Sequence, residues 1–389
     1  MQTTAKRWLA LTGFVASSLL IIVLSSGAFA ADKGVVKADP NGLADLEERI
    51  AELEATVAKK GNRKVSLRIY GQVNKAILWA SDGDDHDTLV TENSASESFV
   101  GFTGEARINS DLKAGFVLEM GVGGYADGTA FGDTNDIYTR RSFVYLESAT
   151  VGKLSVGHLS MASDEITEIT TANTAVASRP LSVRPLVGPQ AGEALDIFDG
   201  ARADGVRYDS PTLQGFKVSA SWTNADLVEN SDAYDIALRY ADDWGQFKVG
   251  AGVAMRKGFT VPTMGSLQDL TTYAGSASVM HMPTGVFLTG IAGHIEGDGV
   301  LSGLPNIKGW QVQGGLEERW NALGKTTVFA EYGELKVDDA DSTPNLIGLG
   351  FVQAVDAAAL DLYVTGRQYS LDMGDDDFTV VMGGARIKF

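Results

Sequence analysis

The residues of this sequence that could do chemistry are mostly carboxylates and guanidinium groups. The stretch 161–202 alone holds six acidic side chains and three arginines. When opposite charges face each other across water, their field orients polar solutes and disfavours apolar ones. The acidic residues are Asp164, Glu165, Glu168, Glu193, Asp196 and Asp199, and the arginines are Arg179, Arg184 and Arg202.

Other kinds of chemistry are poorly represented. The 389 residues include no cysteine, which excludes disulfides, thiolate metal sites and cysteine nucleophiles. The four histidines, His86, His158, His281 and His294, have no serine arrangement that suggests a nucleophile, and no G-x-S-x-G motif occurs. A net charge of −18 argues against a nucleic-acid partner. The sequence predicts neither an enzyme nor a nucleic-acid-binding protein, and no cofactor is expected.

The first thirty residues have the pattern of an export signal. Lys6 and Arg7 precede an apolar stretch over 8–24, and Ala28-Phe29-Ala30 supplies the small residues of a cleavage site. The alternative is a membrane-anchoring helix, because this apolar stretch reaches the lower edge of a membrane span. The pattern favours a cleaved signal peptide over 1–30 and therefore an exported protein.

A short amphipathic segment follows the signal. Its apolar residues fall at spacings of three and four, which is the seam of a coiled coil. The segment 31–62 is therefore predicted to be a periplasmic helix that either packs on its own chain or self-associates. A seam this short would be marginal as an isolated helix, so self-association requires that copies already be held together. The seam residues are Leu43, Leu46, Ile50, Leu53 and Val57.

From residue 65 onward the apolar pattern changes to a period of two. For example, Leu112, Phe116 and Leu118 alternate with Lys113 and Glu119. Segments of about ten residues, apolar on one face and polar on the other, are typical of transmembrane β-barrels. A soluble β-sandwich also alternates, so a single segment decides little.

The lengths of the connections favour the barrel. Short turns alternate with longer loops, as in outer-membrane barrels with an even number of strands. We predict an all-β fold over 63–389, a transmembrane antiparallel β-barrel of about sixteen strands, with fourteen and eighteen as open alternatives. The strands are expected near 65–79, 97–109, 111–124, 136–148, 151–160, 203–210, 213–223, 233–241, 244–255, 271–281, 284–295, 308–319, 323–335, 345–354, 357–369 and 377–389, with 80–96 and 161–202 among the long loops.

Glycines and aromatic residues fit the same architecture. A water-filled interior would explain glycines within strands, such as Gly250, Gly252, Gly383 and Gly384, because no core residue is needed there. Aromatic residues near strand ends suit the girdles at the two membrane interfaces, although ordinary sheet packing is the alternative for each. They are Trp79, Tyr138, Tyr208, Trp222, Tyr240, Trp244, Trp310 and Tyr332.

Several runs resemble a known family. Residues 65–74 (VSLRIYGQVN) resemble the first strand of general porins from alphaproteobacteria, and 98–106 (SFVGFTGEA) are similar to their second strand. Residues 205–211, followed by Gly215 and Phe216, are similar to the strand–turn–strand that follows the long internal loop of those porins.

This resemblance implies a homotrimer of 16-stranded barrels in the outer membrane of a Gram-negative bacterium. It implies that the third long loop, 161–202, folds inward and narrows the pore. The terminal Phe389 matches the aromatic ending that the barrel-assembly machinery reads. The expected partners are therefore further copies of the chain, the assembly machinery, outer-membrane lipid and lipopolysaccharide, and small hydrophilic solutes and ions.

An inward loop would place its acids opposite arginines of the wall, and this arrangement predicts the pore constriction. In an ideal strand Arg140 and Arg141 point to opposite faces, so at most one of them is expected to face the pore. The alternative is that these charges pair locally and merely hold the loop. The predicted constriction residues are Arg68, Arg107, Arg141, Arg207, Asp164, Glu165, Glu168, Asp196 and Asp199.

The predicted function is passive diffusion of small hydrophilic solutes, with a mild preference for cations from the acidic net charge. A substrate-specific channel, for a sugar or another small solute, and a barrel that tethers the envelope are the alternatives. The segment 31–60 is too short to be the plug of a large transporter. Acidic runs at 82–87 and 372–377 are candidates for structural Ca²⁺, with a solvated loop as the alternative.

Overall fold

The computed structural model describes residues 65–81, 83–93, 95–122, 137–178, 198–224, 232–258, 270–297, 306–338, 343–370 and 377–389. The predicted signal peptide (1–30) and the helical segment (31–62) with its seam lie outside the described residues. Among the residues that are described, no helix combines the length and apolar character needed to cross a membrane.

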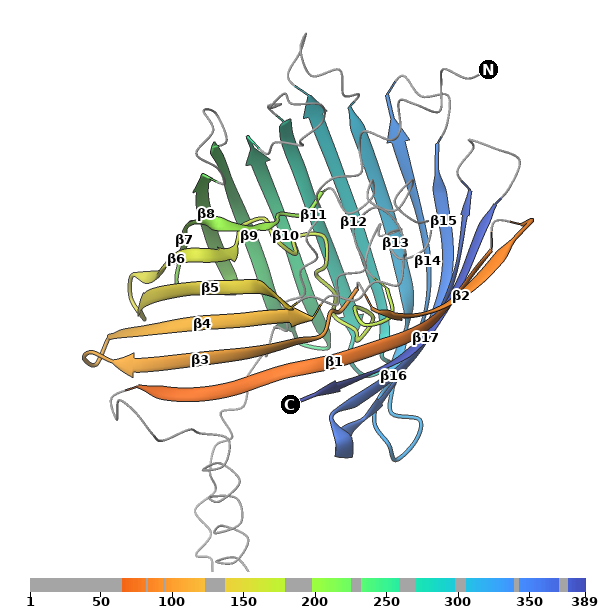
Figure 1. Ribbon diagram of the computed structural model, residues 1–389, viewed down its shortest axis with the longest axis horizontal. Helices are drawn as coiled ribbons and strands as arrows, with labels where there is room; N and C mark the ends of the chain where they lie inside the picture. The colour runs from red at the N-terminus through yellow and green to blue at the C-terminus, as the bar shows by residue number, and fades with distance from the viewer. Residues whose placement is uncertain are drawn as a thin grey trace, which may run out of the picture.

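The described chain is almost entirely β-strand (Figure 1). The elements are β1 Ser66–Ser81, β2 His86–Glu92, β3 Phe99–Arg107, β4 Leu112–Val122, β5 Ile137–Ser148, β6 Gly152–Ser160, β7 Arg202–Asp209, β8 Phe216–Asn224, β9 Asp232–Trp244, β10 Phe247–Lys257, β11 Leu270–His281, β12 Val286–Gly297, β13 Ile307–Glu318, β14 Thr326–Val337, β15 Asn345–Val355, the short 3₁₀ helix η3 Asp356–Ala358, β16 Leu360–Ser370 and β17 Phe378–Lys388.

The sheet closes into a barrel because β1 is paired along both edges. One edge pairs antiparallel with β17, from Gln72 opposite Lys388 to Ser81 opposite Thr379. The other edge pairs first with β3 and then with β2, so these two strands share one position. Seventeen strands therefore form a closed barrel of sixteen positions, which confirms the predicted fold class.

One predicted connection is wrong. The sequence pattern predicted a long loop over 80–96, whereas the chain returns from residue 86 as β2, paired against the upper half of β1. The remaining connections keep the predicted alternation, with short turns such as 245–246 and 356–359 at one rim and longer connections at the other.

Side chains alternate across the wall as the period-two pattern predicts. On β9, Tyr234 and Ile236 are about half exposed on the outer face, whereas Asp235 is 4% exposed on the inner face. The apolar outer face suits lipid, and the polar inner face suits an aqueous interior.

Most of the aromatic residues that were predicted to form girdles, including Trp79, Trp222 and Trp310, lie on the outer face. Tyr138 is the exception, because its hydroxyl donates to Glu97 inside the barrel at 2.8 Å.

The glycines at the end of the chain do not border open water as predicted. A Cβ on Gly384 would come within 2.3 Å of the Tyr363 hydroxyl, so this glycine makes room for a ring packed inside the barrel. Gly383 lies beside Val364, whose side chain is exposed on the outer face.

The close packing where the barrel closes predicts that a side chain added at Gly71 would destabilise the barrel. Gly71 and the terminal Phe389 exchange two backbone hydrogen bonds, of 3.0 and 3.1 Å. A Cβ on Gly71 would lie 2.4 Å from the Phe99 carbonyl oxygen and 2.7 Å from the Phe389 ring. We expect Gly71→Ala to destabilise the barrel by about 1–3 kcal/mol through overpacking.

The measurement is the urea midpoint of refolded protein in detergent or lipid, read by the heat-modifiable shift in gel mobility. Gly290→Ala is the matched control, because a Cβ there meets no atom within 4 Å. Equal midpoints for the two variants would contradict the role given to Gly71.

Candidate functional site

The described parts of the connection between β6 and β7 run inside the barrel (Figure 1). We call residues 161–201 the inward loop; 161–178 and 198–201 are described. Its buried apolar residues include Ile166 and Val176, both 0% exposed. The inward fold that the family resemblance implied for 161–202 stays a prediction for 179–197, which lie outside the described residues.

Two charged residues of the wall, Arg207 and Asp235, bind the loop where it leaves the wall. Arg207 donates from Nη1 to the carbonyl oxygens of Ser160 and Met161, both at 3.0 Å. Asp235 of β9 accepts from the backbone N–H of Ser163 at 2.6 Å. The turn into the lumen is therefore held by hydrogen bonds to charged groups, which are stronger than neutral ones.

Farther along, polar side chains of the wall continue to hold the loop. Ser278 of β11 accepts from the N–H of Thr171 at 2.9 Å. Glu317 of β13 accepts from the N–H of Asn173 at 2.7 Å. The loop thus crosses the inner face from β9 to β13 with its backbone bound at each stage.

At its far side the loop reaches β14 and β16. Ser178 donates to Glu331 at 2.5 Å and accepts from Arg367 Nη2 at 2.6 Å. Glu331 and Arg367 are themselves an ion pair at 2.6 Å, and both side chains are 5% exposed or less. Their mutual pairing lets these charges remain buried while they hold a neutral hydroxyl.

The same path corrects the explanation given for Gly250 and Gly252. A Cβ on Gly252 would lie 2.5 Å from Ile169 and 2.7 Å from Ile166, and one on Gly250 would lie 3.0 Å from Ile169. These glycines therefore make room for apolar side chains of the inward loop, and they do not face open water.

A β-bulge concentrates arginines beside the loop. Glu119 of β4 pairs with Arg141 of β5, but the next residue, Met120, pairs with Thr139, so Arg140 is the extra residue. A bulge breaks the strict alternation of faces. Both Arg140 and Arg141 consequently point inward, which overturns the prediction that at most one of them does.

The two bulge arginines share acidic partners. Arg140 Nη1 donates to Glu119 Oε2 at 2.7 Å, and Arg141 Nε lies 3.6 Å from the same oxygen. Arg141 Nη2 also lies 3.7 Å from Glu165 of the inward loop. The loop and the wall therefore meet here through opposite charges.

Asp164 and Glu165 form the part of the loop that faces these arginines. Asp164 is 3% exposed, and its carboxylate oxygens have no hydrogen-bond partner in the described structure. Its carbonyl accepts from Arg239 of β9 at 2.6 Å. Glu165 has a φ of 62°, a conformation that non-glycine residues seldom adopt and that costs of order 1–3 kcal/mol.

The other predicted constriction residues have different positions. Glu168 is half-buried on the loop, and its N–H donates to the Glu165 carbonyl at 3.3 Å. Asp199 accepts from the N–H of Thr167 at 2.8 Å and thus ties the two described parts of the loop together. Asp196 lies outside the described residues.

Arg68 and Arg107 are corrections to the predicted set. Both are exposed, and neither makes a contact with the described part of the inward loop. Arg68 lies over the Tyr70 ring at 5.8 Å, and Arg107 is paired with Lys113 beside the short turn at 108–111. Their positions along the strands place them near the rim of short turns, below the level of the loop.

Sequence reasoning missed several charged residues of the site. Arg239 and Asp235 could have been found, because both fall on the polar side of the alternation in β9. Arg202 was noted in the loop, but its place at the start of β7 could not be inferred. Arg140 depends on the bulge and Glu97 on a turn before β3, and no simple pattern marks either feature.

No metal site is present among the described residues, where no group of three or more His, Asp or Glu side chains could hold an ion. Parts of the acidic runs at 82–87 and 372–377 lie outside the description, so the Ca²⁺ hypothesis stays a prediction.

A closed barrel with an apolar outer face and a charged loop fixed across its lumen defines a transmembrane β-barrel of the porin type. The chain belongs to the Gram-negative porin family, whose model matches residues 16–377. The family and the barrel place the protein in the outer membrane.

Similar proteins agree with this classification. The major outer membrane protein P.IB of Neisseria sicca is 27% identical over 192 residues, which cover 46% of this chain and 48% of that protein. The chain thus matches about half the length of this curated relative.

Among solved structures, the anion-selective porin from Comamonas acidovorans has a TM-score of 0.62 at 19% identity, covering 84% of this chain and 100% of that one. OmpT of Vibrio cholerae has a TM-score of 0.60 at 16% identity, covering 85% and 99%. At these identities the likeness shows the fold alone.

Glu165 gives the site a predicted dependence on pH. Burial and the neighbouring Asp164 raise the pKa of this loop carboxyl to about 7, against the lowering effect of Arg141, Arg140 and Arg202. A raised pKa means that Glu165 is charged above pH 7 and becomes neutral as the pH falls below it. We expect the cation preference of the channel to decrease between pH 8 and pH 6.

The measurement is the reversal potential in a KCl gradient at both pH values. Glu165→Gln should remove the change between them, because its amide does not titrate. The same pH dependence in the variant would show that another group is responsible.

Proposed function

We propose that the chain is a general diffusion porin, which lets small hydrophilic solutes and ions cross the outer membrane down their own gradients. The observation that supports this proposal is the inward loop, held across the lumen by the wall from Asp235 to Arg367. A barrel of sixteen strands encloses an aqueous channel, so a fixed loop would set its aperture. The process needs no cofactor and no chemical step, and membership of the family supports a channel over an enzyme.

The charge of a solute would be selected at the same depth in the pore as its size. Asp164 and Glu165 of the loop stand near Arg141 of β5 and Arg239 of β9. Such opposed charges in a narrow aqueous gap orient polar solutes and make entry costly for apolar ones. The net charge of −18 supports a mild preference for cations.

The test is single-channel conductance of the purified protein in a planar bilayer under a KCl gradient. We expect ohmic steps and a reversal potential on the cation-selective side. A small conductance that one sugar blocks would favour a substrate-specific channel. No conductance from correctly folded protein would contradict the proposal.

We also infer that the barrel works as a homotrimer, and Lys75 supports an interface between copies. Lys75 lies on the outer face of β1 between Val73 and Ile77, and its side chain is 52% exposed. It forms an ion pair with Glu92, which is opposite it on β2. A lysine facing lipid at mid-membrane costs about 2–4 kcal/mol, which contact with another copy would relieve.

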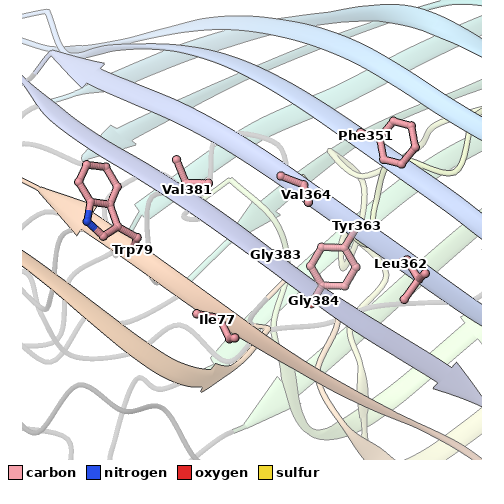
Figure 2. A pocket seen from close by; sticks show the side chains of 9 residues that line it. All are labelled: Ile77, Trp79, Phe351, Leu362, Tyr363, Val364, Val381, Gly383 and Gly384. Carbon is pink, nitrogen blue, oxygen red and sulfur yellow. The ribbon is translucent and has the colours of Figure 1, made fainter.

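An apolar groove lies beside this lysine. It has a volume of about 570 Å³ and runs over the outer faces of β15, β16, β17 and β1 (Figure 2). Ile77 belongs to the lining, two residues from Lys75, and Gly383 leaves space between larger side chains. We assign a second copy of the chain to this face, because lipid would satisfy the groove but not the lysine.

We expect Lys75→Ala to weaken the trimer, because an alanine there removes the cost of about 2–4 kcal/mol that contact with another copy would relieve. The temperature at which the trimer dissociates on a semi-native gel should fall relative to the wild type. Lys336→Ala, at another exposed position on β14, is the matched control. An unchanged dissociation temperature, or a monomeric wild type, would argue against this interface.

A further inference from the structure

The wall of the barrel is interrupted between β2 and β3. β2 ends with Glu92 opposite Lys75, and β3 begins with Phe99 opposite Gln72. On β1, only two residues lie between the stretch paired with β3 and the stretch paired with β2. On the other chain segment, the six residues 93–98 connect β2 to β3. We call 93–98 the β2–β3 insert; Ser94 is outside its described residues.

The insert folds toward the lumen. The inward side chain of Asn74 donates to the Ser96 carbonyl at 2.8 Å, and that of Gln72 donates to the Glu97 carbonyl at 2.7 Å. Ser98 Oγ accepts from the backbone N–H of Asn74 at 2.9 Å, so it replaces a missing bond of the β ladder. Every described residue of the insert is 7% exposed or less.

One end of the insert meets the inward loop, and the other meets the wall where that loop ends. Asn93 Nδ2 donates to the carbonyl of Val176, near the far side of the loop, at 2.7 Å. Glu97 Oε2 lies 3.8 Å from Nη2 of Arg202, where the loop returns to the wall at β7. Between these points Arg386 of β17 donates to Ser96 Oγ at 2.8 Å.

The two segments therefore cover complementary parts of the inner wall. The inward loop is bound to β9, β11, β13, β14 and β16. The insert is bound to β17 and β1, and its Glu97 contacts β5 and β7. Together their described residues form a polar collar at one level of the barrel.

We propose that the β2–β3 insert is the second half of the pore constriction and that Glu97 is a selectivity-determining residue. Glu97 Oε2 lies 3.4 Å from Nε of Arg140 and accepts from the Tyr138 hydroxyl at 2.8 Å, in addition to its contact with Arg202. One carboxylate thus counters two guanidinium groups, whose side chains are 2% exposed or less. Without it, Arg140 would keep only Glu119 and Arg202 would lose this carboxylate, so the collar would gain net positive charge that attracts anions.

This inference rests on the proposed porin function, and the experiment separates the two. Reversal potentials in a KCl gradient give the potassium-to-chloride permeability ratio of the wild type and of Glu97→Gln. We expect the variant to lower this ratio by about twofold or more. The matched control is Glu105→Gln, an acid on β3 that pairs with Lys113 at 3.0 Å below the collar, and it should leave the ratio unchanged.

The outcomes distinguish the proposals. A wild type that conducts, together with a Glu97→Gln variant that keeps the wild-type ratio, would overturn the role of Glu97 and leave the porin function intact. A folded wild type that does not conduct would overturn the porin function itself. Equal shifts in Glu97→Gln and Glu105→Gln would also overturn the inference, since any inner acid would then have the same effect.

A second variant tests the same proposal if Glu97→Gln does not fold. Ala95→Cys keeps Glu97 and changes little volume, and the natural chain has no cysteine that would react in the background. A cationic thiol reagent should lower the permeability ratio of this variant, and an anionic one should raise it. Unchanged currents from protein whose mass shows that the reagent has attached would place the insert away from the path of ions and overturn the proposal.

Discussion

The structure depends on one constraint, which is that no backbone amide of a membrane-spanning strand can be left without a partner in lipid. The first strand meets this constraint only because three strands share its two edges. The terminal residue completes the ladder, since Phe389 exchanges backbone hydrogen bonds with Gly71. Closure then forces every second side chain inward, so the interior must be polar enough to hold water and to bind the segments that enter it.

A polar wall can hold a loop in ways that an apolar core cannot. Asp235, Glu317 and Glu331 each accept a hydrogen bond from the inward loop, and each is 7% exposed or less. A buried carboxylate without hydrogen-bond donors is costly, so each contact stabilises both the wall residue and the loop. The loop is therefore bound over its described length, and its position follows from the inner face of the strands.

The sequence predicted what period-two alternation encodes and missed what interrupts it. The strands, their outer faces and the inward position of Arg141 and Arg207 follow from the alternation. The bulge at Arg140 does not, because an added residue leaves the composition of the strand unchanged. Alternation also carries no information about depth along a strand, which is why Arg68 was assigned to the constriction although it lies near the rim.

The net charge of the chain is a poor guide to the selectivity of such a channel, because the pairing of each inner charge also matters. The net charge of −18 suggests cation preference, but many inner acids have a cation beside them, as Asp361 has Arg386 at 2.7 Å and Glu331 has Arg367 at 2.6 Å. A close ion pair has little field at a distance, whereas a charge that has lost its partner has a field that reaches farther. Selectivity should therefore depend on whether the charges at the collar keep their partners, and removing one partner there should matter more than several substitutions in the outer loops.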